Sequence, residues 1–369
     1  MKYDKINLLY RAPTSIYSSY IYFEGLRRAL ERNGLLYYAF GAGGKEALNM
    51  EELLKYPILC VNGSWEPVFS IVKSVAGRQF VAEINSELLF KGDYYKGLKN
   101  TLITKLSRLG KYFNVLKSSP RQRYKELLQE IRMFLRVNIL KDYLYPYKLM
   151  KERSKYFDLY FSGAEDDLDK YFGKPCYFFI SWAHTELLDD IAKPTSDKIL
   201  FVGALHGTRA DFLKEDKSKI VEARNTSFKK DSTENVRELA RLINEYKYTL
   251  CPVGVIDQYI PGKIFEYLAC KRLCFCHSPK KGTVRIEKFF RDGKEVVYFR
   301  NFPELEKKYQ YYLNNPEEAE RIALTGYEKV RKYHNADARA KYFAQTVLHY
   351  ANGGKYKDEI NDLAIFGVE

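Results

Sequence analysis

Residues 248–276, with the sequence YTLCPVGVIDQYIPGKIFEYLACKRLCFC, decide the fold of this chain. The apolar run 248–252 predicts a buried strand, and the run 273–276 predicts another. Between them, 261–271 has the pattern of a helix, and Pro261 suits its first position because the fixed φ of proline is already helical. A strand, a helix and a second strand in this order are typical of a parallel sheet with helices on its faces.

The same alternation continues along the whole chain. Apolar runs that predict strands recur in both halves, at 6–10, 35–40, 56–61, 80–84, 157–162, 176–180 and 198–203. Helical patterns separate or follow them, at 18–34, 233–246, 303–314, 316–333 and 337–351. A polar stretch at 186–197 predicts a linker. We therefore expect an α/β protein with two Rossmann-like domains, 1–185 and 186–336, then a helix at 337–351 and a tail at 352–369.

The composition agrees with two folded domains and favours an anionic partner. The 369 residues have a mass of 43.3 kDa, and 46% of them are apolar, which excludes a mainly disordered chain. No segment approaches the ~20 apolar residues that a membrane-spanning helix needs. Lys and Arg number 61 against 47 Asp and Glu, which leaves a net charge of +14. This excess favours nucleic acid, an anionic membrane or a phosphorylated substrate, and charge alone does not separate the three.

The cysteines predict a reducing compartment. Their number and uneven spacing do not suit a disulfide scaffold, and most of them lie in apolar runs; they are Cys60, Cys176, Cys251, Cys270, Cys274 and Cys276. The first residues, MKYDKINLLYRAP, have no signal-peptide layout. We therefore expect buried, reduced thiols in a cytoplasmic protein, which could be peripheral at the inner face of a membrane.

Residues 96–155 form a basic stretch of different character. Lys and Arg alternate there with aliphatic and aromatic residues, and Arg121, Arg123 and Lys125 are among them. One interpretation is one or two amphipathic helices whose solvated face is basic. The other interpretation is a surface that docks on anionic lipid or on nucleic acid.

The beginning of the helix at 261–271 has the features of an anion site. The amides of Gly262, Lys263 and Ile264 lie in its first turn, where N–H groups have no partner within the helix. The lysine adds a point charge beside them. Glu266 follows about one turn later, where a carboxylate could accept hydrogen bonds from a ribose diol. These features predict a nucleoside-diphosphate pocket; the alternative, a solvated Lys–Glu pair on an amphipathic helix, fits the spacing equally well.

A second candidate segment follows the strand at 198–203. Gly203 ends that strand at the carboxyl edge of the sheet, where open α/β sheets bind ligands. Arg209, in the loop that follows, could hold a diphosphate through two parallel hydrogen bonds. The segment is not a dinucleotide fingerprint, because the third glycine is absent.

Residues 198–345 resemble the C-terminal half of a glycosyltransferase with the GT-B fold. The most similar group is the family-1-like glycosyltransferases that include the spore-maturation type, whose hallmark appears here as KIFEYLAC, residues 263–270. Other pieces follow in the same order, among them FFRDGKE (289–295) and NPEE (315–318). The N-terminal half is similar more loosely, at EINSE (83–87), YFS (160–162) and ISWAH (180–184).

The resemblance implies two domains that face each other across a cleft and a sugar transfer between them. Residues 186–336 would hold a nucleotide sugar, with UDP favoured, and residues 1–185 would hold the acceptor, while 337–351 would cross back onto the N-terminal domain. The donor ligands it implies are Glu266, Lys263, Arg209, Gly262, Ile264 and Gly203. Relatives with this fold generally need no metal for their chemistry, so neither a metal nor another cofactor is expected.

Three departures from the family pattern stand in this sequence. Lys263 occupies a position where Arg is usual, and Lys271 one where Gly is frequent. Tyr259 stands where many retaining relatives carry the first of two paired glutamates. The sequence therefore leaves open whether the sugar's configuration is retained or inverted.

Three residues are candidates for the catalytic machinery. Glu83 and Glu87 follow a predicted strand of the acceptor domain, where either could deprotonate an acceptor hydroxyl, although a helix-start or surface carboxylate is the commoner explanation. His184, near the predicted hinge, could be a ligand or a base, or a buried structural histidine.

The acceptor is expected to be an envelope or lipid-linked glycan at an anionic membrane surface, because the basic residues of 96–155 lie beside apolar ones. A modified base of DNA is the alternative acceptor, since a phosphate backbone rewards a basic face. A third alternative is a non-catalytic protein that binds nucleotide sugars with the same fold.

Overall fold

The computed structural model gives the chain as two compact units. It describes residues 2–11, 24–42, 48–64, 66–85, 149, 151–163, 173–188, 193–203, 212–224, 232–251, 262–278, 286–355 and 366–367. The first unit comprises Met1–Ser86, Tyr156–Glu165 and Lys174–Glu369, and it contains every strand named below.

The second unit comprises Glu87–Lys155 and Asp166–Gly173. Only residues 149, 151–155 and 173 of it are described, and among them the Ser154 hydroxyl donates to the Lys151 carbonyl at 2.8 Å. The short 3-10 helix η3, Ser154–Tyr156, lies where the chain passes into the first unit. Apart from residues 149 and 151–155, the predicted basic helices of 96–155 therefore lie outside the described residues.

A six-stranded parallel sheet forms the N-terminal part of the first unit. Its strand order is β2-β1-β3-β4-β5-β6. The strands are β1 (Ile6–Arg11), β2 (Leu36–Ala42), β3 (Ile58–Val61), β4 (Val81–Asn85), β5 (Leu159–Ser162) and β6 (Cys176–Phe178). Every residue of β3 and β5 is buried, as expected for strands covered on both faces. The helices described between these strands are α2 (Gly25–Arg32), α3 (Met50–Leu53) and α4 (Val68–Val75).

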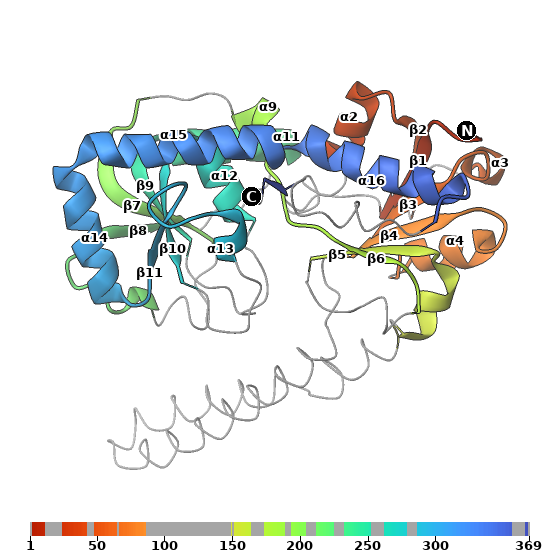
Figure 1. Ribbon diagram of the computed structural model, residues 1–369, viewed down its shortest axis with the longest axis horizontal. Helices are drawn as coiled ribbons and strands as arrows, with labels where there is room; N and C mark the ends of the chain where they lie inside the picture. Colours follow the sequence, from red (N-terminus) through yellow and green to blue (C-terminus); the bar gives the residue numbers. More distant parts are fainter. Residues whose placement is uncertain are drawn as a thin grey trace, which may run out of the picture. The chain divides into compact units, whose positions relative to one another are not determined.

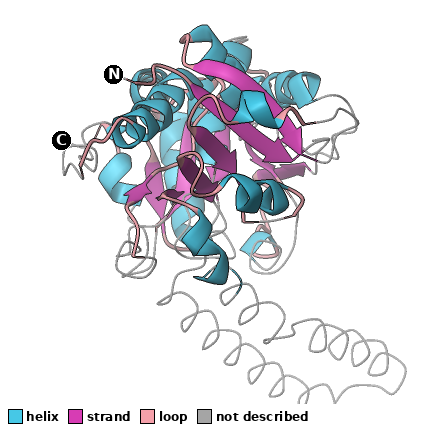
Figure 2. Ribbon diagram, turned by 90° about the vertical axis from the view of Figure 1, so that its right-hand side faces the viewer, coloured by secondary structure: helices cyan, strands magenta, loops and turns pink. Residues whose placement is uncertain are grey.

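A five-stranded parallel sheet follows, with the order β11-β10-β9-β7-β8. Its strands are β7 (Ser196–Val202), β8 (Val221–Arg224), β9 (Tyr246–Cys251), β10 (Leu273–His277) and β11 (Val297–Phe299). Its helices are α9 (Thr185–Leu188), α11 (Ser232–Asn244), α12 (Lys263–Ala269), α13 (Ile286–Phe289), α14 (Phe302–Asn314) and α15 (Pro316–Tyr333). Figure 2 distinguishes the strands of the sheets from the helices by colour. The predicted α/β class with two parallel sheets is confirmed.

The structure adds detail to three regions of the sequence. The polar stretch 186–197 is not a plain linker, because α9 ends and β7 begins within it. The predicted tail contains Phe366, which is 2% exposed and packs its ring against Phe178 of β6 and Phe289 of α13. Lys271, just after α12, has a φ of 54°, which explains why glycine is frequent there in the family.

The chain passes between the two sheets at two neighbouring segments. The Ala183 amide, after β6, donates to the His334 carbonyl, after α15, at 2.9 Å. The buried guanidinium of Arg339 contacts both segments, because it donates to the carbonyls of Ile180 and Tyr333, each at 3.0 Å. These hydrogen bonds hold the two connecting segments side by side.

The last long helix, α16 (Ala336–Ala351), packs against α2 and the N-terminal sheet (Figure 1). Phe343 is fully buried, and its ring lies against those of Phe161, Phe179 and Trp182 at centroid distances of 4.8 to 5.8 Å. The helix thus contributes core residues to a part of the chain that begins more than three hundred positions earlier.

His334 predicts an acid-sensitive stability. Burial, reinforced by the charges of Arg339 and Lys329, holds the pKa of His334 well below its usual value. The unfolded chain therefore binds a proton below pH ~6.5 that the folded chain does not, so stability falls as the pH falls through this range. His334 should account for a loss of about 2 kcal/mol between pH 7 and pH 5. Urea titrations at both pH values should show a smaller loss in His334→Gln, and equal losses would contradict a neutral buried histidine.

Candidate functional site

The helix α12 is buried almost all round, which fixes its position on the C-terminal sheet. Its residues from Ile264 to Ala269 are all buried, and a helix that is apolar on nearly every face belongs inside a domain. The amide of Val202, at the carboxyl end of β7, donates to the Tyr267 hydroxyl at 3.1 Å. The contact places α12 beside the end of β7, and hence beside Gly203, as ligand sites in open α/β sheets require.

A close approach by α15 also holds α12. A Cβ atom on Gly326 of α15 would lie 2.8 Å from a methyl group of Leu268 and 2.7 Å from the carbonyl oxygen of Glu295. Only glycine therefore allows this contact between the two helices.

Lys263 and Glu266 form the charged pair of the candidate site. The Lys263 Nζ lies 2.7 Å from the Glu266 Oε2. Glu266 is only 3% exposed, whereas about a quarter of the Lys263 side chain is accessible. A solvated pair on a helix face is thus the wrong description, because the carboxylate is buried and only the lysine is partly accessible. A buried carboxylate of this kind can accept hydrogen bonds from a ligand's hydroxyl groups where water competes little.

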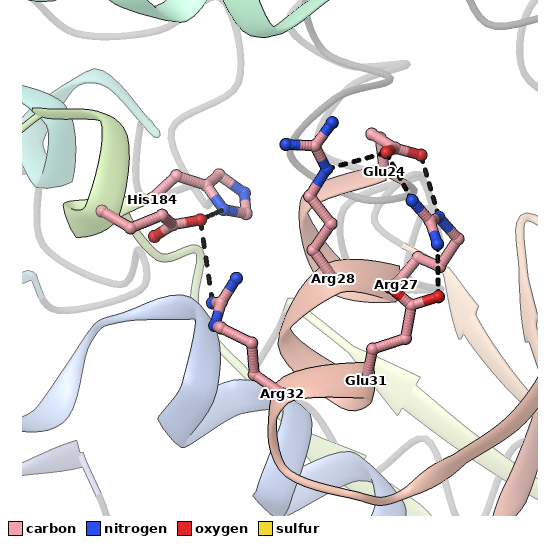
Figure 3. Close-up of polar contacts among 7 residues, drawn as sticks. Glu24, Arg27, Arg28, Glu31, Arg32 and His184 are labelled. Carbon is pink, nitrogen blue, oxygen red and sulfur yellow. Dashed lines mark hydrogen bonds and ion pairs between the residues drawn. The ribbon is translucent and has the colours of Figure 1, made fainter.

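The segment after β6 sends alternate side chains in different directions. Trp182 packs in the N-terminal core, while Ala183 packs in the core around α12. Ser181 lies next to Gly262, which precedes α12. His184 points the other way, toward the first residue of α2 (Figure 3). Residues 181–184 therefore touch the beginnings of one helix from each sheet.

His184 is 2% exposed and lies in a network of charges (Figure 3). Its Nδ1 lies 3.3 Å from a carboxylate oxygen of Glu186, and Glu186 lies 3.8 Å from the Arg32 guanidinium. Arg32 also pairs with Asp337 of α16 at 3.0 Å. The histidine is thus tied through Glu186 to both α2 and α16.

The first turn of α2 carries a second set of ion pairs, shown in the same close-up (Figure 3). Arg27 and Arg28 both donate to Glu24, at 2.7 and 2.8 Å, and Arg27 also pairs with Glu31. These contacts join residues of one helix and stabilise its exposed side by only a few tenths of a kcal/mol, about 0.2–0.5 per pair.

The contact between Gly25 and His184 predicts that substitutions at these two residues have non-additive effects on stability. A Cβ on Gly25 would lie 2.0 Å from the His184 Cε1, and the buried ring has little room to move. Gly25→Ala should lower the free energy of unfolding by about 1–3 kcal/mol, the usual range for overpacking. Adding His184→Ala should recover part of that loss, which chemical denaturation of the two single variants and the double variant measures. Gly163→Ala is the control, because among the described residues its Cβ would meet nothing closer than 3.9 Å. Strictly additive losses would contradict the packing.

Glu83 is placed differently from the sequence prediction. It lies inside β4 and is fully buried, so the description as a surface or helix-start carboxylate is wrong. Its two oxygens accept hydrogen bonds from the amide and the hydroxyl of Ser64, each at 2.7 Å. Burial, followed by the charge of Glu83, raises the pKa of Cys60 and of Tyr160. Glu83 thus anchors the turn after β3.

The remaining predicted site residues divide in two. Gly203 directly follows β7, and Gly262 directly precedes α12. The Ile264 side chain is fully buried, which leaves only the backbone of this residue for a ligand. Glu87 and Arg209 lie outside the described residues. Two residues that the sequence did not single out also make contacts here: Gly25 lies against His184, and Ser181 lies against Gly262. These contacts join segments that are distant in sequence, so no local pattern predicted them.

The described residues were also compared with the requirements of a metal site and of a membrane-spanning helix. No three His, Cys, Asp or Glu side chains gather there in a way that could hold a metal ion. Nor does any helix in the described ranges have the length and apolar character to cross a bilayer. The six cysteines carry thiols rather than disulfides, and all except Cys176 are buried.

Comparison with known proteins agrees with this geometry. Residues 195–345 match a sequence family described as glycosyl transferase-like. Sucrose-phosphate synthase from Thermosynechococcus elongatus is similar in structure, with 10% identity and a TM-score of 0.53, over 95% of this chain and 100% of that one. HepE from Anabaena, in complex with UDP and glucose, has 10% identity and a TM-score of 0.51, over 94% of this chain and 100% of that one. A comparison with curated protein sequences found no match.

These matches confirm the resemblance to the GT-B glycosyltransferases. The chain has their α/β fold with two parallel sheets, and its C-terminal part is glycosyltransferase-like in sequence as well.

Proposed function

We propose that this chain is a glycosyltransferase that moves a sugar from a nucleoside-diphosphate sugar to an acceptor hydroxyl. The observation that carries the proposal is the Lys263–Glu266 pair, which stands at the beginning of α12, beside the end of β7, within the residues that match the glycosyl transferase-like family. UDP is the favoured nucleotide, and the complex of HepE with UDP and glucose supports that choice.

In the proposed donor complex, the two charged side chains bind different parts of the nucleotide. Glu266 accepts hydrogen bonds from the ribose diol, and its burial keeps water from competing for them. Lys263, the more accessible partner, contacts the diphosphate together with Arg209. Their positive charge stabilises the negative charge that grows on the leaving diphosphate, which is the main electrostatic demand of the transfer.

The transfer itself breaks the bond between the sugar's anomeric carbon and the diphosphate oxygen and forms a bond to the acceptor oxygen. The acceptor's proton passes to a base, for which Glu87 is our candidate. His184 is proposed to hold the beginning of α2 in place, since its Nδ1 contacts Glu186 and its ring touches Gly25. Glu83, held by Ser64 inside the sheet, is assigned the support of the turn after β3 rather than proton transfer.

We assign the donor to residues 186–336 and the acceptor to residues 1–185, across a cleft that 337–351 helps to maintain. We also propose that transfer needs no metal ion, so activity should survive an excess of EDTA.

Calorimetric titration tests the donor assignment. The protein should bind UDP with one site per chain and more tightly than ADP or GDP. Equal affinity for all three would contradict the preference for uridine, and no binding of any of them would contradict the nucleotide-sugar function.

A second function is favoured by one residue. Tyr259 occupies the place of a family glutamate, so a protein that binds nucleotide sugars without transferring them is the second candidate. Saturable UDP binding without turnover of any nucleotide sugar would support it.

The acceptor is proposed to be an envelope or lipid-linked glycan, with a modified DNA base as the alternative. Reversing the charges of Arg121, Arg123 and Lys125 should weaken binding to anionic liposomes and leave donor hydrolysis unchanged, because these residues belong to the acceptor domain. Binding to liposomes and to duplex DNA at two salt concentrations measures this. DNA binding that falls steeply with salt, without liposome binding, would favour DNA. If charge reversal changed neither interaction, the stretch would be a solvated helix face.

A further inference from the structure

Ser181, in the segment between β6 and α9, has a buried hydroxyl group that makes no hydrogen bond within the described residues. The residue is 5% exposed, and its hydroxyl oxygen has no hydrogen-bond partner in the described part of the chain. A buried hydroxyl without a partner destabilises the fold, because its lost contacts with water are not replaced. Buried groups of this kind are rare in native proteins, and a bound ligand is one of the explanations for them.

The unpartnered hydroxyl points at the candidate donor site. Its oxygen lies 3.4 Å from where a Cβ on Gly262 would stand, so it faces the backbone immediately before Lys263. Gly262 has an ordinary helical φ of −56°, and glycine is therefore not required there by the backbone. What the glycine provides is space in front of the Ser181 hydroxyl.

We propose that the Ser181 hydroxyl donates a hydrogen bond to a phosphate oxygen of the donor's diphosphate. The inference rests on the proposed function and adds a ligand to the same site. A phosphate oxygen is the group that fits, because the hydroxyl lies beside Gly262, which directly precedes the cationic Lys263 in the sequence, while the carboxylate of Glu266 suits the ribose. The diphosphate would then contact a residue that follows the N-terminal sheet as well as residues of the C-terminal one.

The proposal predicts opposite effects of Ser181→Ala on binding and on stability. The affinities for UDP and for inorganic pyrophosphate should each fall about 10-fold, or about 1.4 kcal/mol. The affinity for uridine, which lacks phosphate, should not change. The melting temperature should stay the same or rise, because the variant removes a buried hydroxyl that has no partner in the free protein.

Two further variants sharpen the test. Gly262→Ala places a methyl group in the space in front of the hydroxyl and should weaken UDP binding at least as much. The fold should stay intact, since the backbone angle suits alanine and the nearest contact within the described ranges is 3.4 Å. Ser74→Ala is the control, because this exposed serine on α4 only donates to the Ile71 carbonyl; its UDP affinity should equal that of the wild type.

Calorimetry with UDP, pyrophosphate and uridine separates the outcomes. Unchanged affinity for UDP in Ser181→Ala, or an equal loss for uridine, overturns the phosphate contact alone. Pyrophosphate binding that depends on Ser181, in a wild type that binds no nucleotide, overturns the proposed function and supports the contact. A wild type that binds none of the three overturns both.

Discussion

Glu266→Gln is expected to weaken the binding of UDP by a factor of about 10 to 150. This range corresponds to about 1.5–3 kcal/mol, the contribution of hydrogen bonds to a charged group. The amide has nearly the shape of the carboxylate, so it fills the same buried place beside Lys263. It replaces one acceptor oxygen with a donor and removes the negative charge. Calorimetric titration with UDP measures the change, and far-ultraviolet circular dichroism should show that the fold is kept.

The partner of Glu266 should behave differently. Lys263→Met removes the cation and leaves the buried carboxylate without this ion pair, so it should reduce stability as well as UDP affinity. Glu318→Gln on α15 is a matched control, since Glu318 forms an exposed pair with Arg321, also three positions away. Its UDP affinity should not change. If Glu266→Gln bound UDP as tightly as this control, the donor assignment would be wrong.

Phe343→Ala on α16 is expected to lower the free energy of unfolding by about 3–5 kcal/mol. The Phe343 ring is fully buried among aromatic rings of the N-terminal core, so its removal leaves a cavity. A loss of this size is a large part of the 5–15 kcal/mol by which proteins are typically stable. Truncation before Asp337 removes the whole helix except Ala336 and should abolish soluble expression.

Leu324→Ala on α15 is the control for this prediction. Leu324 is 38% exposed, and a substitution there should change stability by no more than about 0.5 kcal/mol. Urea denaturation of both variants gives the comparison. A truncated chain that remained stable and active would contradict the packing of α16 in the N-terminal core.

The strands in the middle of each sheet were the most predictable part of the fold. Runs such as 58–61 and 159–161 are apolar because both faces of these strands are covered. The strands β8 and β11 lie at opposite edges of the second sheet and escaped prediction. The first is partly exposed and contains two charged residues, and the second has only three residues, so neither gives a clear pattern.

The candidate site was predictable only as far as it is local in sequence. Lys263 and Glu266 are three positions apart on one helix, so their spacing alone indicated that they could meet. The burial of Glu266 and the place of Ser181 depend on contacts between distant segments, which periodicity does not contain. The burial of Glu83 was missed for a related reason, because its partner Ser64 lies 19 positions earlier in the sequence and only the fold brings the two together.

The most direct test of the glycosyltransferase function is the release of UDP from a panel of UDP-sugars by the purified protein. Slow hydrolysis occurs when water replaces the acceptor, so it requires no knowledge of the acceptor. We expect one or a few UDP-sugars to be hydrolysed by the wild type and the rate to fall at least about 10-fold in Glu266→Gln at subsaturating donor. Release of UDP from no member of the panel, or equal rates in the wild type and the variant, would contradict the function proposed for this site.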